Sequence, residues 1–246
     1  MNRERYHLID ALRGFSLVNM LVFHFLYDVY VVCGLDIHWA GYPGIVTWER
    51  FICVPFILIS GISLNFSRHA YRRGLIINAC GLLITLVTWI AVPEQIILFG
   101  ILNFIGCAMM LTQLIRPLLE KLNPFAGFAA GILLYGFFYG LPRGFVGFFD
   151  IAIAKVPEIF YSVPPLAVLG LPSREFFSTD YFPLLPWLFL YIAGFFLWRV
   201  IVSRHWERFF TLRVPVLDFI GRYTLWIYMI HQPVLMGVAY LLFGMR

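Results

Sequence analysis

Seven apolar segments, each long enough to cross a lipid bilayer as a helix, constrain this chain more than any other feature of its sequence. A spanning helix needs about 20 apolar residues, because it rises only about 1.5 Å per residue. The chain is 61% hydrophobic and 13% charged, whereas soluble domains carry about 25% charged residues. The sequence therefore predicts an all-α, polytopic membrane helix bundle with spans near residues 8–32, 45–66, 74–92, 96–115, 124–141, 182–202 and 218–243.

Basic residues gather in a few short loops and predict the orientation of these spans. They precede the first span and follow the second, fourth and sixth: Arg3, Arg5, Arg68, Arg72, Arg73, Arg116, Lys121, Arg199, Arg204, Arg208 and Arg213. With seven spans all these loops fall on one side, which is then the cytoplasmic side. We expect the N-terminus inside, the C-terminus outside, membrane lipids as partners and no nucleic acid, since the loops account for the net charge of +5.

The segment 147–172 is apolar but is interrupted by charged residues and prolines. As an eighth span it would move the last basic loop to the outside, so we expect a re-entrant or interfacial segment on the outer face, covered by helices. The sequence contains no repeat, low-complexity tract or linker. Residues 1–246 are therefore expected to form a single domain.

Four ionisable residues share one face of the first predicted span: Asp10, Arg13, His24 and Asp28. On a helix that turns about 100° per residue, Arg13 and His24 are about 20° apart, and each aspartate lies within about 40° of His24. Ionisable side chains inside a membrane are costly and indicate a functional site. A carboxylate one turn from His24 can accept an imidazole N–H and leave the other ring nitrogen as a general base. The alternative is a buried His–Asp pair that only joins helices.

Two further histidines extend this candidate site. His231 falls near the middle of the last predicted span, at a depth that can match His24. A second buried histidine close to the first would support a catalytic or proton-conducting site, and the alternative is an amphipathic helix contact. His38 and Trp39 follow the first span in a segment rich in turn residues, which suits either the mouth of a site or an ordinary interfacial loop.

Other site chemistries find no matching pattern. The sequence has no phosphate-binding glycine loop, GxSxG elbow or HExxH motif, so hydrolases and nucleotide-driven pumps are not supported. The four cysteines stand singly, with neither disulfide nor zinc spacing. We expect no metal.

Several segments together resemble the bacterial relatives of the heparan-α-glucosaminide N-acetyltransferase catalytic domain. They are residues 10–14 (DALRG), 23–28 (FHFLYD), 56–64 (FILISGISL), 180–187 (DYFPLLPW) and 219–233 (FIGRYTLWIYMIHQP). The ten residues between Arg13 and His24 are also similar to the membrane motif of the wider transmembrane acyltransferase superfamily. The resemblance covers nearly the whole chain.

This resemblance implies an acyltransferase of the bacterial inner membrane that passes an acyl group from cytosolic acyl-CoA to a sugar or glycan acceptor on the outer side. Acetyl-CoA is the expected donor, and the length of the acyl chain stays open. His38 stands where the lysosomal enzyme carries its catalytic histidine, but the match is partial, whereas His24 matches the superfamily's other histidine. We expect His24 to be the base, with Asp28 orienting it and His38 as the other catalytic candidate. The chain is shorter than the lysosomal enzyme, which is compatible with a homodimer.

Binding roles follow from the same comparison. Arg13 lies about 16 Å from His24 along the helix, too far to stabilise a thioester oxyanion, and is expected to bind CoA together with Arg72 and Arg73. Trp39 and His231 are the candidate ligands of the acceptor. N- versus O-acylation stays open, as do two other functions: a proton-coupled transporter or exporter, and a non-catalytic membrane scaffold. The lack of a visible inverted repeat counts against the transporter.

Overall fold

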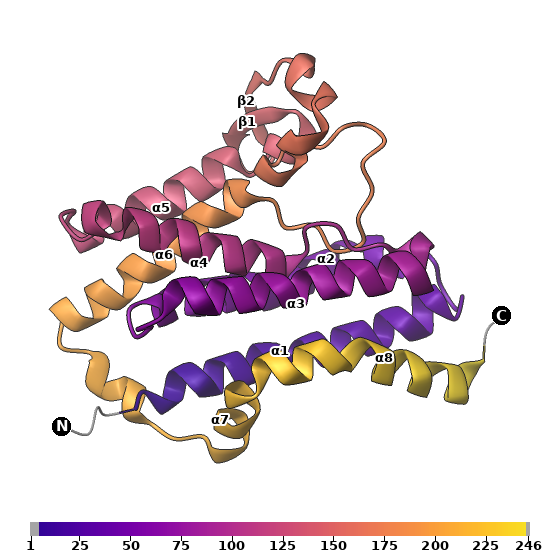
Figure 1. Ribbon diagram of the computed structural model, residues 1–246, viewed down its shortest axis with the longest axis horizontal. Coiled ribbons are helices and arrows are strands. Elements are labelled where there is room, and N and C mark those ends of the chain that lie inside the picture. The colour runs from indigo at the N-terminus through magenta and orange to yellow at the C-terminus, as the bar shows by residue number, and fades with distance from the viewer. Residues whose placement is uncertain (1–4, 245–246) are drawn as a thin grey trace. The chain divides into compact units, whose positions relative to one another are not determined.

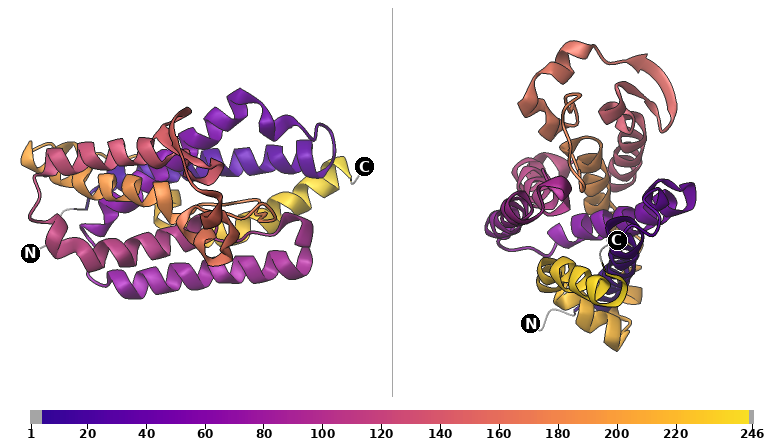
Figure 2. Two further views of the ribbon diagram at one scale, coloured as in Figure 1. Left: turned by 90° about the horizontal axis from the view of Figure 1, so that it is seen from above. Right: turned by 90° about the vertical axis from the view of Figure 1, so that its right-hand side faces the viewer.

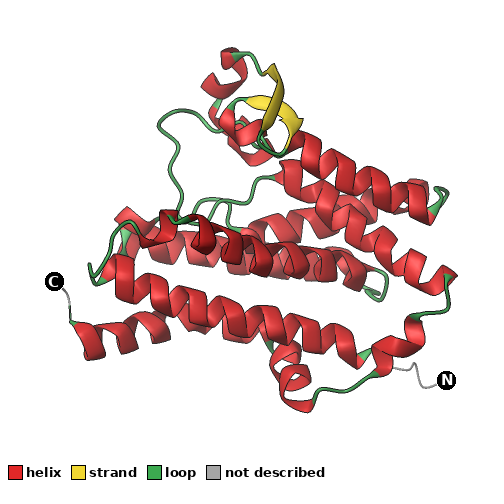
Figure 3. Ribbon diagram, turned by 180° about the vertical axis from the view of Figure 1, so that it is seen from behind, coloured by secondary structure: helices red, strands yellow, loops and turns green. Residues whose placement is uncertain are grey.

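A computed structural model describes residues 5–244 and has a mostly helical fold (Figure 3). Its helices are α1 (His7–Tyr27), α2 (Pro43–Leu64), α3 (Ala70–Ala91), α4 (Ile101–Leu119), α5 (Pro124–Phe138), α6 (Leu184–Ser203), α7 (Pro215–Arg222) and α8 (Thr224–Phe243). All of these except α7 belong to the seven segments of the described chain that are long and apolar enough to cross a membrane. The seven predicted spans are therefore confirmed, and the protein is a multi-pass membrane protein.

The described chain forms two compact units. The first contains the residues up to Ile59 and those from His205 onwards, and the second is Ser60–Arg204, so that α2 crosses the boundary. Within the first unit, α1 lies alongside α7 and α8 (Figure 1). Leu17 and Met20 of α1 pack with Ile52 of α2 in its core.

The last predicted span, 218–243, begins too early. The helix breaks at Tyr223, which separates α7 from α8. The reason is the packing of α7 on α1: a Cβ added to Gly14 would lie 2.1 Å from the carbonyl oxygen of Leu217. A Cβ added to Gly221 would lie 1.8 Å from the carbonyl oxygen of Asp10. Backbones approach this closely only where side chains are absent, and this contact gives α7 a direction that α8 does not share.

The second unit contains two helix pairs, α3 with α4 and α5 with α6, which run side by side in two views (Figures 1 and 2). Glycines allow both pairs to pack closely. A Cβ on Gly81 of α3 would meet the Asn103 side chain of α4 at 2.6 Å, and a Cβ on Gly131 of α5 would meet Ala193 of α6 at 2.9 Å. Asn103 donates to the carbonyl oxygen of Asn78 on α3 (3.4 Å), so polar groups inside this pair bond across the helices.

The segment 147–172 does not form an eighth span. The segment begins inside β1 (Phe145–Phe148), which forms an antiparallel hairpin with β2 (Ile151–Lys155). Two short 3₁₀ helices follow, Glu158–Ser162 and Pro164–Leu169. The all-α expectation did not include these strands. The sequence of β2, Ile-Ala-Ile-Ala-Lys, lacks the apolar–polar alternation by which a half-buried strand is recognised. All five of its residues are exposed in the structure.

The hairpin is fixed to the end of α5 and closed by an ion pair. Arg143 contacts Asp150 across the turn (Nη1 to Oδ1, 2.6 Å). The ring of Phe148 lies 5.7 Å from that of Phe137 on α5. Gly147 stands at the bulge of β1, where a Cβ would lie 2.0 Å from the carbonyl oxygen of Ile151. Packing on α5 and this close strand contact therefore hold the segment.

Candidate functional site

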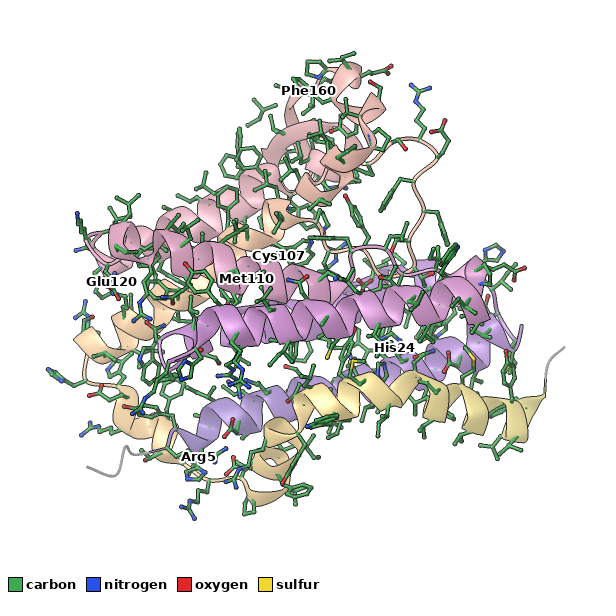
Figure 4. All side chains as sticks on the ribbon, viewed as in Figure 1. Arg5, His24, Cys107, Met110, Glu120 and Phe160 are labelled. Atoms are coloured by element: carbon green, nitrogen blue, oxygen red, sulfur yellow. The ribbon has the colours of Figure 1, made fainter. Side chains whose placement is uncertain are left out.

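Two histidines from opposite ends of the sequence meet where α1 and α8 run together. The ring centroids of His24 and His231 are 5.0 Å apart, with an interplanar angle of 62°. Figure 4 labels His24 on α1, beside α8. His231 is the eighth residue of α8, about 10 Å along the helix from its start. The structure thus brings together the two histidines that the sequence indicated by their depth.

The hydrogen bond of His231 fixes its tautomer. Its Nδ1 lies 2.5 Å from the carbonyl oxygen of Tyr228, one turn earlier on α8. A carbonyl oxygen only accepts, so Nδ1 carries the hydrogen of the neutral ring and Nε2 carries the lone pair. This Nε2 is buried and has no hydrogen-bond partner. It is therefore an acceptor whose lone pair is not used within the described chain.

The prediction that Asp28 accepts a hydrogen bond from His24 is wrong. Asp28 is fully buried, and its Oδ1 accepts a hydrogen bond of 2.7 Å from Gln232 Nε2 on α8. Its Oδ2 is buried without a partner, as is Oε1 of Gln232. Asp28 begins the π-helical turn Asp28–Val32, and its carboxylate turns to the neighbouring helix instead of back along its own. Spacing along one helix could not reveal this competitor, which lies 204 residues away.

Three buried acceptor atoms on α1 and α8 have no donor in the described chain: Asp28 Oδ2, His231 Nε2 and Gln232 Oε1. Buried polar atoms in folded proteins are normally hydrogen-bonded. Gln232 was not among the residues selected from the sequence. A polar residue next to His231 inside an apolar span was the only signal that could have drawn attention to it.

An aromatic cluster joins the loop after α1 to this site. Trp39 is buried, its ring parallel to that of Tyr30 at 5.6 Å and 5.5 Å from that of Phe23. Phe23 in turn lies 5.9 Å from His24. Trp39 holds the loop on α1 in this conformation, and its predicted contact with the acceptor stays a prediction.

His38 is exposed on the same loop, and its ring does not take part in this cluster. Its backbone N–H donates to Asp36 Oδ1 (3.0 Å), and the hydroxyl of Tyr42 donates to Asp36 Oδ2 (3.0 Å). This second hydrogen bond raises the pKa of Tyr42 above its ordinary value. Asp36 thus stabilises the turn, while the exposed ring of His38 lacks the fixed tautomer found at His231.

Arg13 belongs to an ionic cluster near the start of α1. Its Nη1 contacts Asp10 Oδ1 at 2.8 Å, and Arg5 contacts the other carboxylate oxygen at 2.8 Å. Arg13 is 22% exposed and Arg5 52% exposed at the side chain. Arg72 and Arg73 are exposed in the first turn of α3, in the second unit. The predicted binding of CoA by these three arginines stays a prediction.

Another buried histidine, His7, ties α7 to α1 and was not found from the sequence. His7 Nδ1 lies 3.1 Å from Asp218 Oδ2, and Arg213 Nε donates to His7 Nε2 (3.1 Å). Since Arg213 must donate, His7 Nε2 accepts and Nδ1 donates to Asp218. Both ring nitrogens are thus occupied, which distinguishes His7 from His231 and gives it a structural role.

The chain was compared with known proteins. The family model described as "Heparan-alpha-glucosaminide N-acetyltransferase, catalytic" matches residues 5–233. This range includes His24, His38 and His231, as well as Asp28 and Gln232. Comparisons with curated proteins and with solved structures gave no match.

Proposed function

Since the chain belongs to the heparan-alpha-glucosaminide N-acetyltransferase catalytic-domain family, a family of membrane acetyltransferases that use acetyl-CoA, we propose that it acetylates a sugar or glycan at the outer membrane face. The observation that carries this proposal is the His24–His231 pair, in which the buried Nε2 of His231 is free and its tautomer is fixed. Acetyl transfer to a hydroxyl or amino group needs such a base.

The chemistry assigned to this pair is general base followed by general acid. His231 Nε2 takes the proton of the acceptor's hydroxyl or amino group as its oxygen or nitrogen bonds to the thioester carbonyl carbon. The bond between that carbon and sulfur then breaks, and the proton passes to the CoA thiolate. The products are the acetylated acceptor and CoA. His24, whose ring is 5.0 Å away, is the second candidate base and contacts the same reacting group.

The acetyl donor is proposed to arrive from the cytoplasmic side, where the basic loops lie in the predicted orientation. Arg13, Arg72 and Arg73 carry the charges that suit the CoA phosphates. The exposure of Arg72 and Arg73 supports this role, because both side chains reach solvent at the start of α3. The predicted homodimer belongs to the same proposal, and so does the bacterial inner membrane as its location.

The test is acetyl transfer by purified protein in lipid nanodiscs. Acetyl-CoA labelled in the acetyl group is supplied with glucosamine, galactosamine or glucose, and labelled products are identified by mass spectrometry. We expect label in at least one sugar and release of one CoA per acetyl group transferred. If no sugar is labelled, the proposed acetyl transfer is wrong, and a lack of acetyl-CoA binding at millimolar concentration would exclude it independently. Proton-driven transport then becomes the better interpretation of the role of the histidine pair.

A further inference from the structure

The hydrogen bond between Asp28 and Gln232 leaves two acceptor oxygens without donors, and neither oxygen has a role in the proposed acetyl transfer. Gln232 Nε2 donates to Asp28 Oδ1 (2.7 Å). The other oxygen of each group, Asp28 Oδ2 and Gln232 Oε1, is buried and unpartnered. Because each belongs to the same planar group as a bonded atom, both oxygens lie close to this hydrogen bond.

These two oxygens require hydrogen-bond donors. A carboxylate and an amide oxygen can only accept, and the neighbouring Nε2 of His231 is an acceptor too. Asp28 is fully buried, and no basic side chain of residues 5–244 forms an ion pair with it. A buried carboxylate with a single neutral donor is unfavourable unless further donors approach it. A bound molecule that brings several N–H or O–H groups would supply these donors.

We propose that Asp28 Oδ2 and Gln232 Oε1 bind the hydroxyl or amino hydrogens of the acceptor sugar, and that Gln232 is the positioning residue that holds Asp28 in place for it. A sugar carries several such hydrogens around the group that reacts, whereas the acetyl thioester carries none. The subsite lies in the span, one helical turn from His24 on α1 and next to His231 on α8. It does not involve His38 or Trp39. This inference rests on the proposed function.

The decisive variant is Asp28→Asn, because it should impair binding of the sugar while it keeps the hydrogen bond between α1 and α8. The asparagine oxygen can still accept from Gln232 Nε2, so the bond between α1 and α8 is retained. The atom that replaces Oδ2 is now an NH₂ group, which donates and cannot receive the sugar's hydrogens. We expect the KM for the sugar to rise at least about tenfold, with an unchanged KM for acetyl-CoA and a melting temperature near that of the wild type.

Two further variants complete the comparison. Gln232→Leu removes the bond to Asp28, so we expect a higher KM for the sugar together with a lower melting temperature. Asp218→Asn is the matched control, since Asp218 is also buried with one bonded oxygen, to His7, and one unpartnered oxygen. It lies on α7, away from the proposed subsite, and should leave the KM for the sugar unchanged in folded protein.

Kinetics are measured with whichever of glucosamine, galactosamine and glucose the wild type acetylates best. An Asp28→Asn enzyme with an unchanged KM for the sugar would reduce the pair to a helix contact and overturn the inference. Equal increases of KM for sugar and acetyl-CoA would overturn it as well. In both cases the wild type still transfers acetyl groups, so the proposed function stands. A wild type that acetylates none of the sugars would instead contradict both the proposed function and this inference.

Discussion

At the scale of single residues, His231 differs from His38 in its burial and in its fixed tautomer. His231→Ala removes the buried Nε2 whose tautomer Tyr228 fixes, and we expect kcat to fall by about 10² to 10⁴. His24→Ala, which removes the adjacent ring, is expected to lower kcat as well. His38 is exposed on the loop, so His38→Ala should change mainly the KM for the acceptor. The measurement is initial rates with saturating acetyl-CoA and a varied sugar. Near-normal turnover in both span variants, with none in His38→Ala, would move the chemistry to the loop.

Arg13 is the residue whose role in donor binding can be separated from its ion pair. We expect Arg13→Ala to weaken acetyl-CoA binding about tenfold, since a charge-assisted contact with a phosphate is lost, and to weaken it more than His24→Ala does. Titration calorimetry in nanodiscs measures this. Arg5→Ala is the control, because Arg5 pairs with the same Asp10. Equal losses in both variants would mean that Arg13 acts only through Asp10.

At the scale of elements, the packing of α7 on α1 depends on two glycines. Gly221→Ala would place a methyl group 1.8 Å from the carbonyl oxygen of Asp10, and Gly14→Ala would place one 2.1 Å from that of Leu217. Neither backbone oxygen can move without shifting its helix, so we expect a loss of about 1–3 kcal/mol or more for each. Thermal unfolding in detergent measures it. Gly237→Ala on α8 is the matched control, since nothing lies within 4 Å of its added Cβ. A similar loss there would contradict the packing argument.

At the scale of the whole molecule, the prediction concerns orientation. Seven spans, together with the basic loops, predict that the N-terminus is inside and the C-terminus outside. Reporter fusions at residues 70, 120 and 205 should read cytoplasmic, and one at residue 150, in the turn of the hairpin, should read external. The readouts are a reporter that is active only in the cytoplasm and one that is active only outside. An external reading at residue 205 would contradict the predicted topology.

The seven spans and the depth of the two histidines followed from the sequence, because both depend on local properties. Length and apolarity decide whether a segment can cross the bilayer, and a fixed rise per residue sets how deep His24 and His231 lie. The break at Tyr223 could not be predicted in the same way. It depends on the contact of Gly14 with Leu217 and of Gly221 with Asp10, which are far apart in the chain.

Within the site, the sequence by itself determined which polar side chains enter the membrane, since apolar spans make each of them conspicuous. Only the tertiary structure decided their partners. Asp28 lies one turn from His24, yet it bonds to Gln232 on α8, and His231 bonds to the backbone of its own helix. The physical reason is that a hydrogen bond depends on distance and direction between two particular atoms. Sequence periodicity shows which residues share one face of a helix. It does not show which other helix packs against that face.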